Sequence, residues 1–432
     1  MKVAIAGYGI EGKSNYTYFL NQGHEVVIVD EHEVKDAPVD ASVIWGENAF
    51  SRLKGFDMVV RTAGLAPRKI VTDGKIWSAT NEFLAKCPAP IIGVTGSKGK
   101  GTTCSLIASI LRAGGHTVHL VGNIGVPALD ILPTIQTGDI VVYEMSSFQL
   151  WDAEKSPQVA VVLMIEPDHL DVHKNFDEYV GAKANIATHQ RVIDLVVYKA
   201  QNSLSSSIAS ASAGDKVGFP WVQTAHVSDD AFWYGDTRLC DVNALKLPGV
   251  HNLDNACAAI DAAWRWVKDG DVIAKGLSAF TGLPHRLKFV QEIEGVKYYD
   301  DSIATTPGSA IAAMYAFSQP KILILGGSSK GANFSEVART AQEVGIKLAI
   351  LIGEEAKKLQ PLFENVRVPF VNLGTEVSME EVVDTAYKKA VPGDVVVLSP
   401  ACASFGMFKN YADRGEQFIA AVNALNPSEV IQ

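Results

Sequence analysis

The chain has 432 residues, enough for about three domains that each have a core of their own. Hydrophobic residues make up 47% and charged residues 20%, which is typical of ordered globular proteins. The net charge of −10 excludes a general nucleic-acid binder and a protein held on anionic lipid, because both need a basic surface.

Short β-branched runs alternate with helical patterns along the whole chain. This alternation predicts an α/β protein with mostly parallel sheets covered by helices. A proline-marked break at 87–90 and a linker-like segment at 281–286 predict three domains, 1–89, 90–281 and 282–432. We expect the first and third to be Rossmann-like and the central one to resemble a P-loop ATPase. The predicted strands are 3–6, 25–29, 58–60, 91–94, 140–143, 159–165, 192–198, 321–325, 348–352, 370–373 and 395–398, and helical patterns cover 102–112 and 175–189.

A glycine turn follows the first predicted strand. Gly7, Gly9 and Gly12 have the spacing Gly-x-Gly-x-x-Gly, and Asp30 ends the next strand. Glycines let the backbone approach a phosphate closely, and the helix N-terminus supplies aligned N–H groups. The pattern therefore predicts a nucleotide-diphosphate site. A tight structural turn and the NAD site of a dehydrogenase have the same pattern, and both alternatives stay open at this point.

A second glycine-rich loop, residues 95–103, also joins a strand to a helix. Its small residues expose successive N–H groups, and Lys100 is placed to reach terminal phosphates. Val94 occupies the first glycine position of the usual phosphate-binding pattern, and Gly101 replaces its magnesium-binding hydroxyl, so that Thr102 is the nearest substitute. A lysine in a merely structural loop is the alternative. The predicted ATP-binding residues of the loop are Gly96, Ser97, Lys98, Gly99, Lys100, Gly101 and Thr102.

Three candidate metal ligands lie at or near the ends of two central strands. Glu144 follows the strand 140–143, and Asp168 and His169 follow the strand 159–165. The carboxyl edge of a parallel sheet is where α/β proteins bind ligands. Carboxylates and an imidazole beside a phosphate loop indicate magnesium that bridges nucleotide phosphates.

These motifs and several others together resemble the Mur ligase family. They occur in order along nearly the whole chain, so a chance match is excluded. The segments that carry the resemblance are 95–103, 122–127, 144–149, 168–169, 181–183, 251–255, 284–286, 301–302, 326–327 with Lys330, and 399–404.

The resemblance implies a UDP-sugar on the first domain, ATP on the central domain and an incoming amino acid largely on the third. The glycine turn and Asp30 would then bind UDP rather than NAD. Asn123 and Ser146 match positions that contact the UDP-muramoyl substrate, Asn255, Arg286 and Asp301 match ATP-contacting positions, and Lys330, Ser404 and Tyr411 match positions around the amino acid.

The resemblance also implies the catalytic and metal-binding roles. Lys100 would hold the β and γ phosphates, and Glu144 and His169 would coordinate Mg²⁺ with Thr102. Lys183 matches the family's carbamylated lysine, whose carbamate gives an anionic ligand where an ammonium would repel the metal. Lys100, Lys183 and His169 are therefore the expected catalytic residues, and ATP and Mg²⁺ the expected cofactors.

The implied activity is an ATP-dependent ligase that joins glutamate to UDP-N-acetylmuramoyl-L-alanine through an acyl phosphate, in peptidoglycan precursor synthesis. Three alternatives stay open: the same ligation with L-glutamate, a ligase similar to folylpolyglutamate synthase, and a non-catalytic nucleotide-binding regulatory protein. The D enantiomer is favoured because Lys330, Ser404 and Tyr411 are retained. Ile303, however, stands where the family's D-glutamate ligases usually have a lysine.

Cysteine spacing and the N-terminal sequence bear on the compartment. The five cysteines contain no Cys-x-x-Cys pair, which favours neither a zinc knuckle nor a disulfide framework. No signal segment precedes the first strand, and no apolar run approaches the ~18 residues of a membrane span. We expect a cytoplasmic monomer without nucleic-acid or membrane partners.

Overall fold

The computed structural model describes residues 1–122, 126–169, 172–328 and 331–425. The chain divides into two compact units, Met1–Leu245 with Asn252–Phe280, and Lys246–His251 with Thr281–Gln432.

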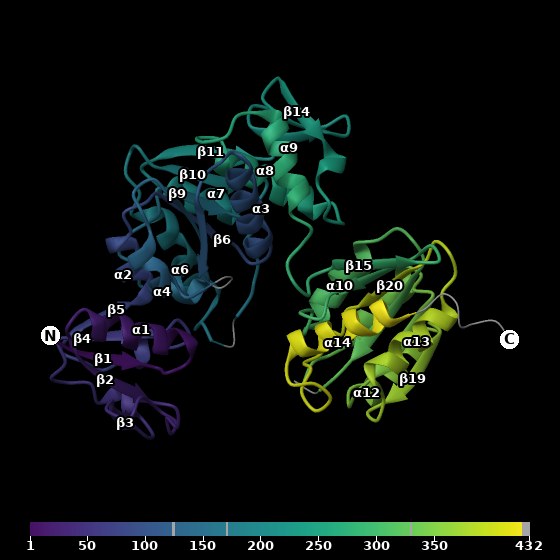
Figure 1. Ribbon diagram of the computed structural model, residues 1–432, viewed down its shortest axis with the longest axis horizontal. Coiled ribbons are helices and arrows are strands. Elements are labelled where there is room, and N and C mark those ends of the chain that lie inside the picture. The colour runs from purple at the N-terminus through teal and green to yellow at the C-terminus, as the bar shows by residue number, and fades with distance from the viewer. Residues whose placement is uncertain (123–125, 170–171, 329–330, 426–432) are drawn as a thin grey trace. The chain divides into compact units, whose positions relative to one another are not determined.

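The first unit begins with a five-stranded parallel sheet (Figure 1). Its strand order is β3-β2-β1-β4-β5, so successive strands are added to one side of β1 up to β3 and to its other side from β4 on, which makes β1/β4 the switch point of the sheet. A crevice at the carboxyl ends of two such strands is the usual ligand site of this fold. The strands are β1 Lys2–Ala6, β2 Glu25–Asp30, β3 Ser42–Trp45, β4 Met58–Arg61 and β5 Lys75–Ser78, and the helices are α1 Ile10–Asn21 and α2 Ala79–Lys86.

A second parallel sheet forms the centre of the same unit. Its order is β11-β10-β9-β6-β8-β7. The predicted phosphate-binding loop, residues 95–103 and called the phosphate loop below, follows the inner strand β6. The strands are β6 Ile91–Thr95, β7 Val118–Gly122, β8 Ile140–Glu144, β9 Val159–Val162, β10 Leu195–Lys199 and β11 Asp215–Phe219. The helices are α3 Lys100–Ala113, α4 Ala128–Ile131, α5 Ser147–Leu150, α6 Phe176–Thr188, α7 Ser203–Ser210, α8 His251–Ala263 and α9 Gly270–Ala279. A small antiparallel sheet contains β12 Ala225–Ser228, β13 Ala231–Tyr234 and β14 Thr237–Asp241.

One apolar core joins the two parallel sheets of this unit. It contains Ile5 of β1, Phe83 of α2, Leu129 of α4 and Tyr143 of β8, all buried. The rings of Phe83 and Tyr143 meet edge to face at 5.4 Å, and the Tyr143 hydroxyl lies 3.3 Å from Thr80 Oγ1. The glycine turn and the phosphate loop therefore belong to one packed body.

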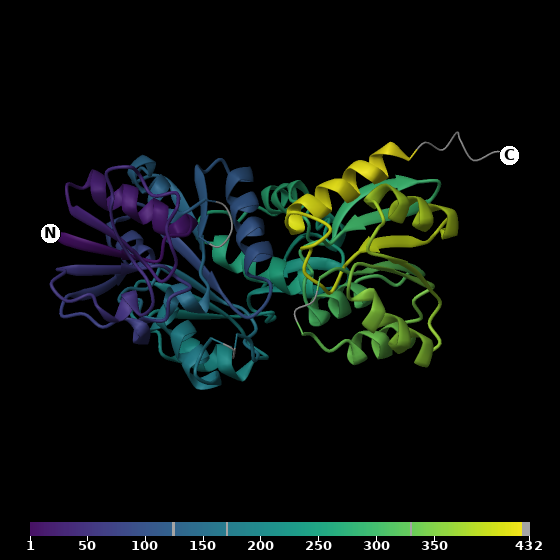
Figure 2. The same ribbon diagram turned by 90° about the horizontal axis from the view of Figure 1, so that it is seen from below.

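The second unit is a six-stranded sheet with helices on both faces (Figure 2). Its order is β15-β16-β20-β17-β18-β19, with only the edge strand β15 antiparallel to its neighbour among the described strands. The strands are β15 Lys288–Ile293, β16 Val296–Asp300, β17 Lys321–Gly326, β18 Leu348–Ile352, β19 Phe370–Gly374 and β20 Val395–Leu398. One core lies beneath α10 Pro307–Tyr315, α11 Ser335–Glu343 and α12 Ala356–Asn365, and the other beneath α13 Met379–Lys389 and α14 Tyr411–Ala424.

The predicted fold class is confirmed, and several elements differ from the prediction. The strand predicted at 192–198 begins only at Leu195, because Val192 and Ile193 are 76% and 69% exposed and lie in a turn. The strand predicted at 159–165 ends at Val162. The small antiparallel sheet was not predicted, because its strands are short and only partly apolar. The exact domain boundaries at 89 and 281 stay a prediction.

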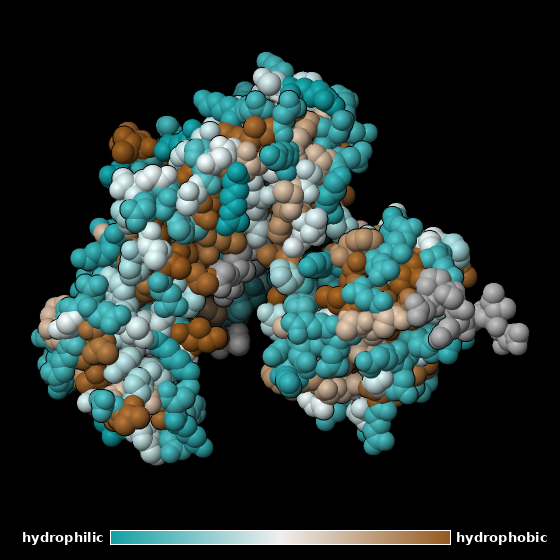
Figure 3. Space-filling view, viewed as in Figure 1, coloured by the Kyte–Doolittle hydropathy of each residue, from teal (hydrophilic) through white to brown (hydrophobic). Residues whose placement is uncertain are grey.

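Hydrophilic residues dominate the surface seen in Figure 3, and apolar residues form separate small patches on it. Exposed apolar side chains such as Ile10, Val39 and Trp221 come from distant parts of the sequence, which is normal for a globular protein. Among the described helices, none is long and apolar enough to cross a membrane.

Two helical glycines give a test of the packing in the first unit. A Cβ at Gly276 of α9 would lie 2.5 Å from Cα of Ile110 in α3, whereas a Cβ at Gly181 of α6 would meet nothing within 4 Å. We expect Gly276→Ala to lower the free energy of unfolding by about 1–3 kcal/mol, because backbone has to move. The matched control Gly181→Ala should raise it by about 0.5–1 kcal/mol. Denaturant unfolding measures both, and equal effects would contradict the close approach of α3 and α9.

Candidate active site

The phosphate loop leaves β6 after Thr95 and enters α3 at Lys100. Gly96 and Gly99 both have positive φ, 153° and 84°. A Cβ at Gly99 would also lie 2.6 Å from Oδ1 of Asn255. Glycine is therefore required there both by backbone conformation and by a close neighbour.

Two lysines converge on one carbonyl of this loop. Lys100 Nζ donates to the carbonyl of Gly96 at 3.0 Å and to that of Ser97 at 3.1 Å. Lys183 Nζ, from α6, donates to the same Gly96 carbonyl at 2.9 Å and to Thr95 Oγ1 at 3.3 Å. Two cationic side chains beside one glycine loop form a site suited to anions.

Lys183 is almost completely buried. Its residue exposure is 2%, and burial followed by the charge of Lys100 holds its pKa well below the usual value of a lysine. Asp168 and Glu144 act in the opposite direction, which places both carboxylates in electrostatic reach of Lys183. A lysine with a lowered pKa is a better nucleophile because more of it is neutral.

Helix α6 also holds the phosphate loop through Tyr179, one turn before Lys183. The Tyr179 ring lies 4.7 Å from Lys183 Nζ, and its hydroxyl lies 2.8 Å from Ser97 Oγ. Ser97 Oγ donates to the carbonyl of Glu166 at 2.8 Å, and Lys98 Nζ pairs with the Glu166 carboxylate at 2.8 Å. The loop is thus fixed from two sides.

Asn255, on α8, lies beside the same loop although it is distant in sequence. Its Oδ1 accepts from Thr103 Oγ1 at 3.4 Å, and its Nδ2 donates to Asn252 Oδ1 at 3.0 Å. Gly101 and the buried Thr102 lie in the first turn of α3. The structure therefore brings the predicted ATP residue Asn255 to the predicted loop.

Glu144 ends β8 at the carboxyl edge of the central sheet. It pairs with Val94 of β6, next to the phosphate loop, and is 3% exposed. Asp168 and His169 follow β9, and their side chains are 42% and 48% exposed. His169 Nε2 lies 3.6 Å from Asp168 Oδ2, and the His169 ring packs against Phe148 at 5.0 Å between centroids.

Glu144, Asp168 and His169 are the side chains at this edge whose donor atoms could hold a magnesium ion. Within the described ranges, no three His, Cys, Asp or Glu side chains form a metal-binding cluster. Magnesium usually keeps several waters and takes further ligands from substrate phosphates, with only one or two protein carboxylates. Glu144 supplies one buried carboxylate beside the loop, so the donor set fits an ion held largely by nucleotide phosphates.

The glycine turn of the first sheet lies at the switch point between β1 and β4. A Cβ at Gly7, where φ is 93°, would lie 2.4 Å from Thr62 Oγ1, and one at Gly12 would lie 2.1 Å from the Gly7 carbonyl. Gly9 is the N-cap of α1, and both Gly9 and the first helical residue Ile10 are exposed. Asp30 accepts hydrogen bonds from the backbone N–H of Tyr8 at 2.9 Å and His32 at 3.0 Å. Asp30 therefore stabilises the turn itself.

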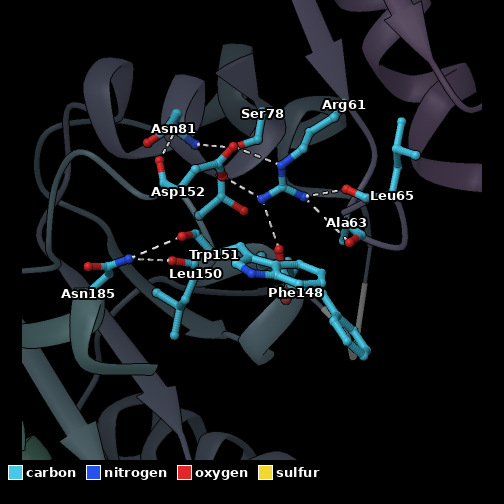
Figure 4. A network of polar contacts seen from close by, with 12 residues as sticks. Arg61, Ala63, Leu65, Ser78, Asn81, Phe148, Leu150, Trp151, Asp152 and Asn185 are labelled. Atoms are coloured by element: carbon cyan, nitrogen blue, oxygen red, sulfur yellow. Dashed lines mark hydrogen bonds and ion pairs between the residues drawn. The ribbon is translucent and has the colours of Figure 1, made fainter. Parts of the chain in front are cut away.

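Ser146 is the N-cap of the short helix α5. Its Oγ accepts from the N–H of Gln149 at 3.2 Å, and the Gln149 side chain accepts from the N–H of Ser146 at 2.9 Å, which forms a capping box. The end of α5 is held from other elements (Figure 4): Asn185 of α6 donates to the carbonyl of Leu150 at 2.9 Å, and Asn81 of α2 to that of Asp152 at 2.9 Å.

Four of the remaining predicted residues lie in the second unit. Asp301 directly follows β16, and its carboxylate accepts from Ser399 Oγ at 2.7 Å and the N–H of Leu287 at 3.2 Å. Ser404 is buried and Tyr411, the first residue of α14, is 42% exposed. Arg286 is exposed, and its charge partly offsets the rise in the pKa of Asp301 that burial causes. The predicted residues Asn123 and Lys330 lie outside the described residues.

Two groups around the site were missed by the sequence analysis. Tyr179 could have been found, because it lies four residues before Lys183 and so on the same face of a predicted helix. Phe148 lies in the segment 144–149 that carries the family resemblance. The stacking of its ring on that of His173 at 5.3 Å left no comparable signal, because the two residues come from different segments.

The pKa of Asp301 gives a test in the second unit. Burial raises it to about 7, so the folded state binds the proton more tightly than the unfolded state. The resulting stabilisation is complete below about pH 4 and is lost as the pH rises through about 7. Between pH 5 and pH 8, we expect the free energy of unfolding of wild type to fall by about 1–3 kcal/mol relative to that of Asp301→Asn.

Denaturant unfolding at both pH values measures this difference. Asp384→Asn, which neutralises an exposed carboxylate paired with Lys388, is the matched control and should show no such trend. A difference between wild type and Asp301→Asn that is the same at pH 5 and pH 8 would refute the raised pKa.

Comparison with known proteins identifies the family. A family model named Mur ligase middle domain matches residues 94–263, and one named Mur ligase, glutamate ligase domain matches residues 285–402. A protein of Acetivibrio thermocellus named UDP-N-acetylmuramoylalanine--D-glutamate ligase is 38% identical over 98% of this chain and 96% of its own.

Solved structures show the same fold at low sequence identity. The UDP-N-acetylmuramate-alanine ligase MurC from Thermotoga maritima aligns with a TM-score of 0.61 and 17% identity over 98% of this chain and 99% of its own. The MurF ligase from Thermotoga maritima in complex with ADP aligns with a TM-score of 0.57 and 16% identity over 97% and 93%. The predicted resemblance is confirmed, and the chain belongs to the Mur ligase family.

Proposed function

We propose that this ligase joins D-glutamate to the L-alanyl carboxylate of UDP-N-acetylmuramoyl-L-alanine, with ATP as the energy source, in peptidoglycan precursor synthesis. The observation that carries the proposal is the convergence of Lys100 and Lys183 on the Gly96 carbonyl, beside the buried Glu144. The full-length similarity to a D-glutamate ligase supports the choice of substrates. We place the enzyme in the cytoplasm as a monomer.

The reaction has two steps. An oxygen of the alanyl carboxylate attacks the γ-phosphorus of ATP, the bond to the bridging oxygen breaks, and ADP and an acyl phosphate form. The neutral amine of glutamate then attacks the acyl carbon, the carbon–oxygen bond to phosphate breaks, and the amine loses a proton. Phosphate is a far better leaving group than hydroxide, which is why ATP is needed.

Charge stabilisation is the main task of the phosphate loop. Lys100 and the N–H groups of Lys98 and Gly99 offset the negative charge that gathers on the transferred phosphoryl group, whereas the N–H of Ser97 is already donated to the carbonyl of Met164 at 2.9 Å. Mg²⁺, when bound, neutralises phosphate charge, and Glu144, His169, Thr102 and carbamylated Lys183 would hold it. Asn255, Arg286 and Asp301 are the further residues proposed for ATP.

The other substrates use the remaining predicted residues. The turn Gly7, Gly9 and Gly12, with Asp30 as its support, binds the UDP diphosphate at the helix N-terminus, and Asn123 and Ser146 contact the muramoyl part. Lys330, Ser404 and Tyr411 are the residues proposed to bind glutamate. Ile303 provides no charge-assisted contact, which is worth roughly 1.5–3 kcal/mol where a lysine meets a carboxylate, so glutamate affinity should be modest.

Lys183 is proposed to carry a carbamate, formed when its neutral amine adds to carbon dioxide and loses a proton. We expect Lys183→Ala to lose most activity and to regain part of it with added short carboxylates, which would replace the missing anion. Turnover by phosphate release measures both effects. Lys155→Ala, which changes an exposed lysine, is the control that should stay active, and wild-type turnover by Lys183→Ala would refute the role.

The function itself is tested by phosphate release with UDP-N-acetylmuramoyl-L-alanine and D- or L-glutamate side by side. We expect release to need both substrates and to prefer D-glutamate by at least about tenfold in kcat/KM. Lys100→Ala should abolish release but keep UDP-substrate binding by calorimetry, because the two phosphate sites lie on different sheets.

Three other outcomes of the phosphate-release assay would each favour one of the alternative functions. A preference for L-glutamate would overturn the acceptor and leave the ligase chemistry intact. Release with a folate substrate instead would indicate a folylpolyglutamate synthase-like ligase. Nucleotide binding without any substrate-dependent release would indicate the non-catalytic regulatory protein.

A further inference from the structure

Arg61, the last residue of β4, is completely buried at the junction of the two parallel sheets of the first unit (Figure 4). Its Nε donates to Asp152 Oδ2 at 2.8 Å, and its Nη2 pairs with Asp152 Oδ1 and donates to the carbonyl of Phe148 at 2.9 Å. Its Nη1 faces the carbonyls of Thr62, Ala63 and Leu65 at 3.3–3.4 Å. Every N–H of the guanidinium therefore faces an acceptor.

The two ends of this network lie at the two halves of the proposed substrate site. The loop 62–65 follows β4 at the switch point, where Thr62 touches the glycine turn and the N–H of Ala63 donates to Glu11 in the first turn of α1 at 2.8 Å. At the other end, Phe148 belongs to α5, and its ring packs against His169 at 5.0 Å and His173 at 5.3 Å.

A UDP-linked substrate has to reach from the glycine turn to the phosphate loop. Its reacting carboxylate is placed correctly only if the two sheets keep a fixed spacing, and a misplacement of about 1 Å can lower the rate about 100-fold. Arg61 binds carbonyls of the loop 62–65 at the first half and the Phe148 carbonyl of α5 at the second half simultaneously. A lysine is a point charge with fewer donors and cannot serve all these acceptors.

We propose that Arg61 is a positioning residue that sets the span between the UDP half and the reacting half of the substrate; this rests on the function proposed above. Asp152, whose side chain is 24% exposed, is its counter-ion and orients the guanidinium. The role is one of alignment, because Arg61 is buried among protein groups and reaches the substrate only through α5 and the loop 62–65.

Arg61→Lys and Asp152→Asn test the proposal against a matched control. Lys75 of β5 also links the first sheet to the segment after α5, through Glu154 at 2.9 Å, but both side chains are about half exposed. We expect Arg61→Lys to lower kcat/KM for UDP-N-acetylmuramoyl-L-alanine about 10- to 100-fold, with calorimetric binding of UDP alone and KM for ATP changed less than about threefold. Asp152→Asn should show a smaller effect of the same kind, and Lys75→Met should match wild type.

Hydrogen exchange adds a readout that does not depend on turnover. Both Arg61→Lys and Asp152→Asn should speed amide exchange in 62–65 and 147–152 together, while the central β6 amides stay protected. Unchanged kinetics, unchanged exchange, or a parallel loss of UDP and ATP binding would each overturn the proposal. Failure of the proposed function is recognised separately, because wild type would then release no phosphate with the UDP-linked substrate. Amide exchange would still test whether Arg61 holds the loop 62–65 and the segment 147–152 together.

Discussion

The contact of Lys100 and Lys183 with a single carbonyl of the phosphate loop is the interaction on which the site depends. Two ammonium groups so close together, one of them buried, are unfavourable unless anions lie nearby, and burial and mutual repulsion accordingly lower the pKa of Lys183. Glu144 and Asp168 partly compensate this charge. In the proposed active state, a carbamate would replace the Lys183 ammonium by an anion, and a nucleotide triphosphate would neutralise the charge of Lys100.

The fold explains why these groups meet. β6 lies inside the central sheet between β8 and β9. The loop after β6, Glu144 at the end of β8 and the segment of Asp168 after β9 therefore share one edge of the sheet. In the first sheet, the glycine turn likewise follows the carboxyl end of a strand, β1, at the switch point between β1 and β4. Since one apolar core joins the two sheets, the glycine turn and the loop 95–103, which are the two proposed phosphate sites, belong to one body. Hydrogen bonds tie α5 and the residues directly after it to α2, α6 and β4.

Local patterns were enough to predict the glycine turn, the phosphate loop and the strands that carry them. Each depends on glycine conformations and apolar periods within about ten residues, which a single sequence contains. Asn255 and Lys183 needed the family resemblance, because nothing near them in sequence distinguishes them from ordinary helical residues. The structure then placed both at the loop.

The groups that sequence reasoning missed depend on contacts between distant segments. Arg61 ends an apolar strand, and only the fold shows that its partners are 87 and 91 positions away. Tyr179 contacts Ser97 across 82 positions. Asp30 and Ser146 were predicted as substrate contacts, and the structure adds that each also stabilises its own turn or helix end. The Ser-x-x-Gln spacing of Ser146 and Gln149 is the sequence signature of a capping box, whereas the support that Asp30 gives to its turn has no comparable local signal.

The central claim, that phosphate activates the alanyl carboxylate in this site, is tested most directly by oxygen transfer. UDP-N-acetylmuramoyl-L-alanine labelled with ¹⁸O in its terminal carboxylate is incubated with ATP and D-glutamate, and the released phosphate is analysed by mass spectrometry. An acyl phosphate requires one labelled oxygen in each phosphate released. Unlabelled phosphate, formed at the same rate as the amide product, would contradict the mechanism.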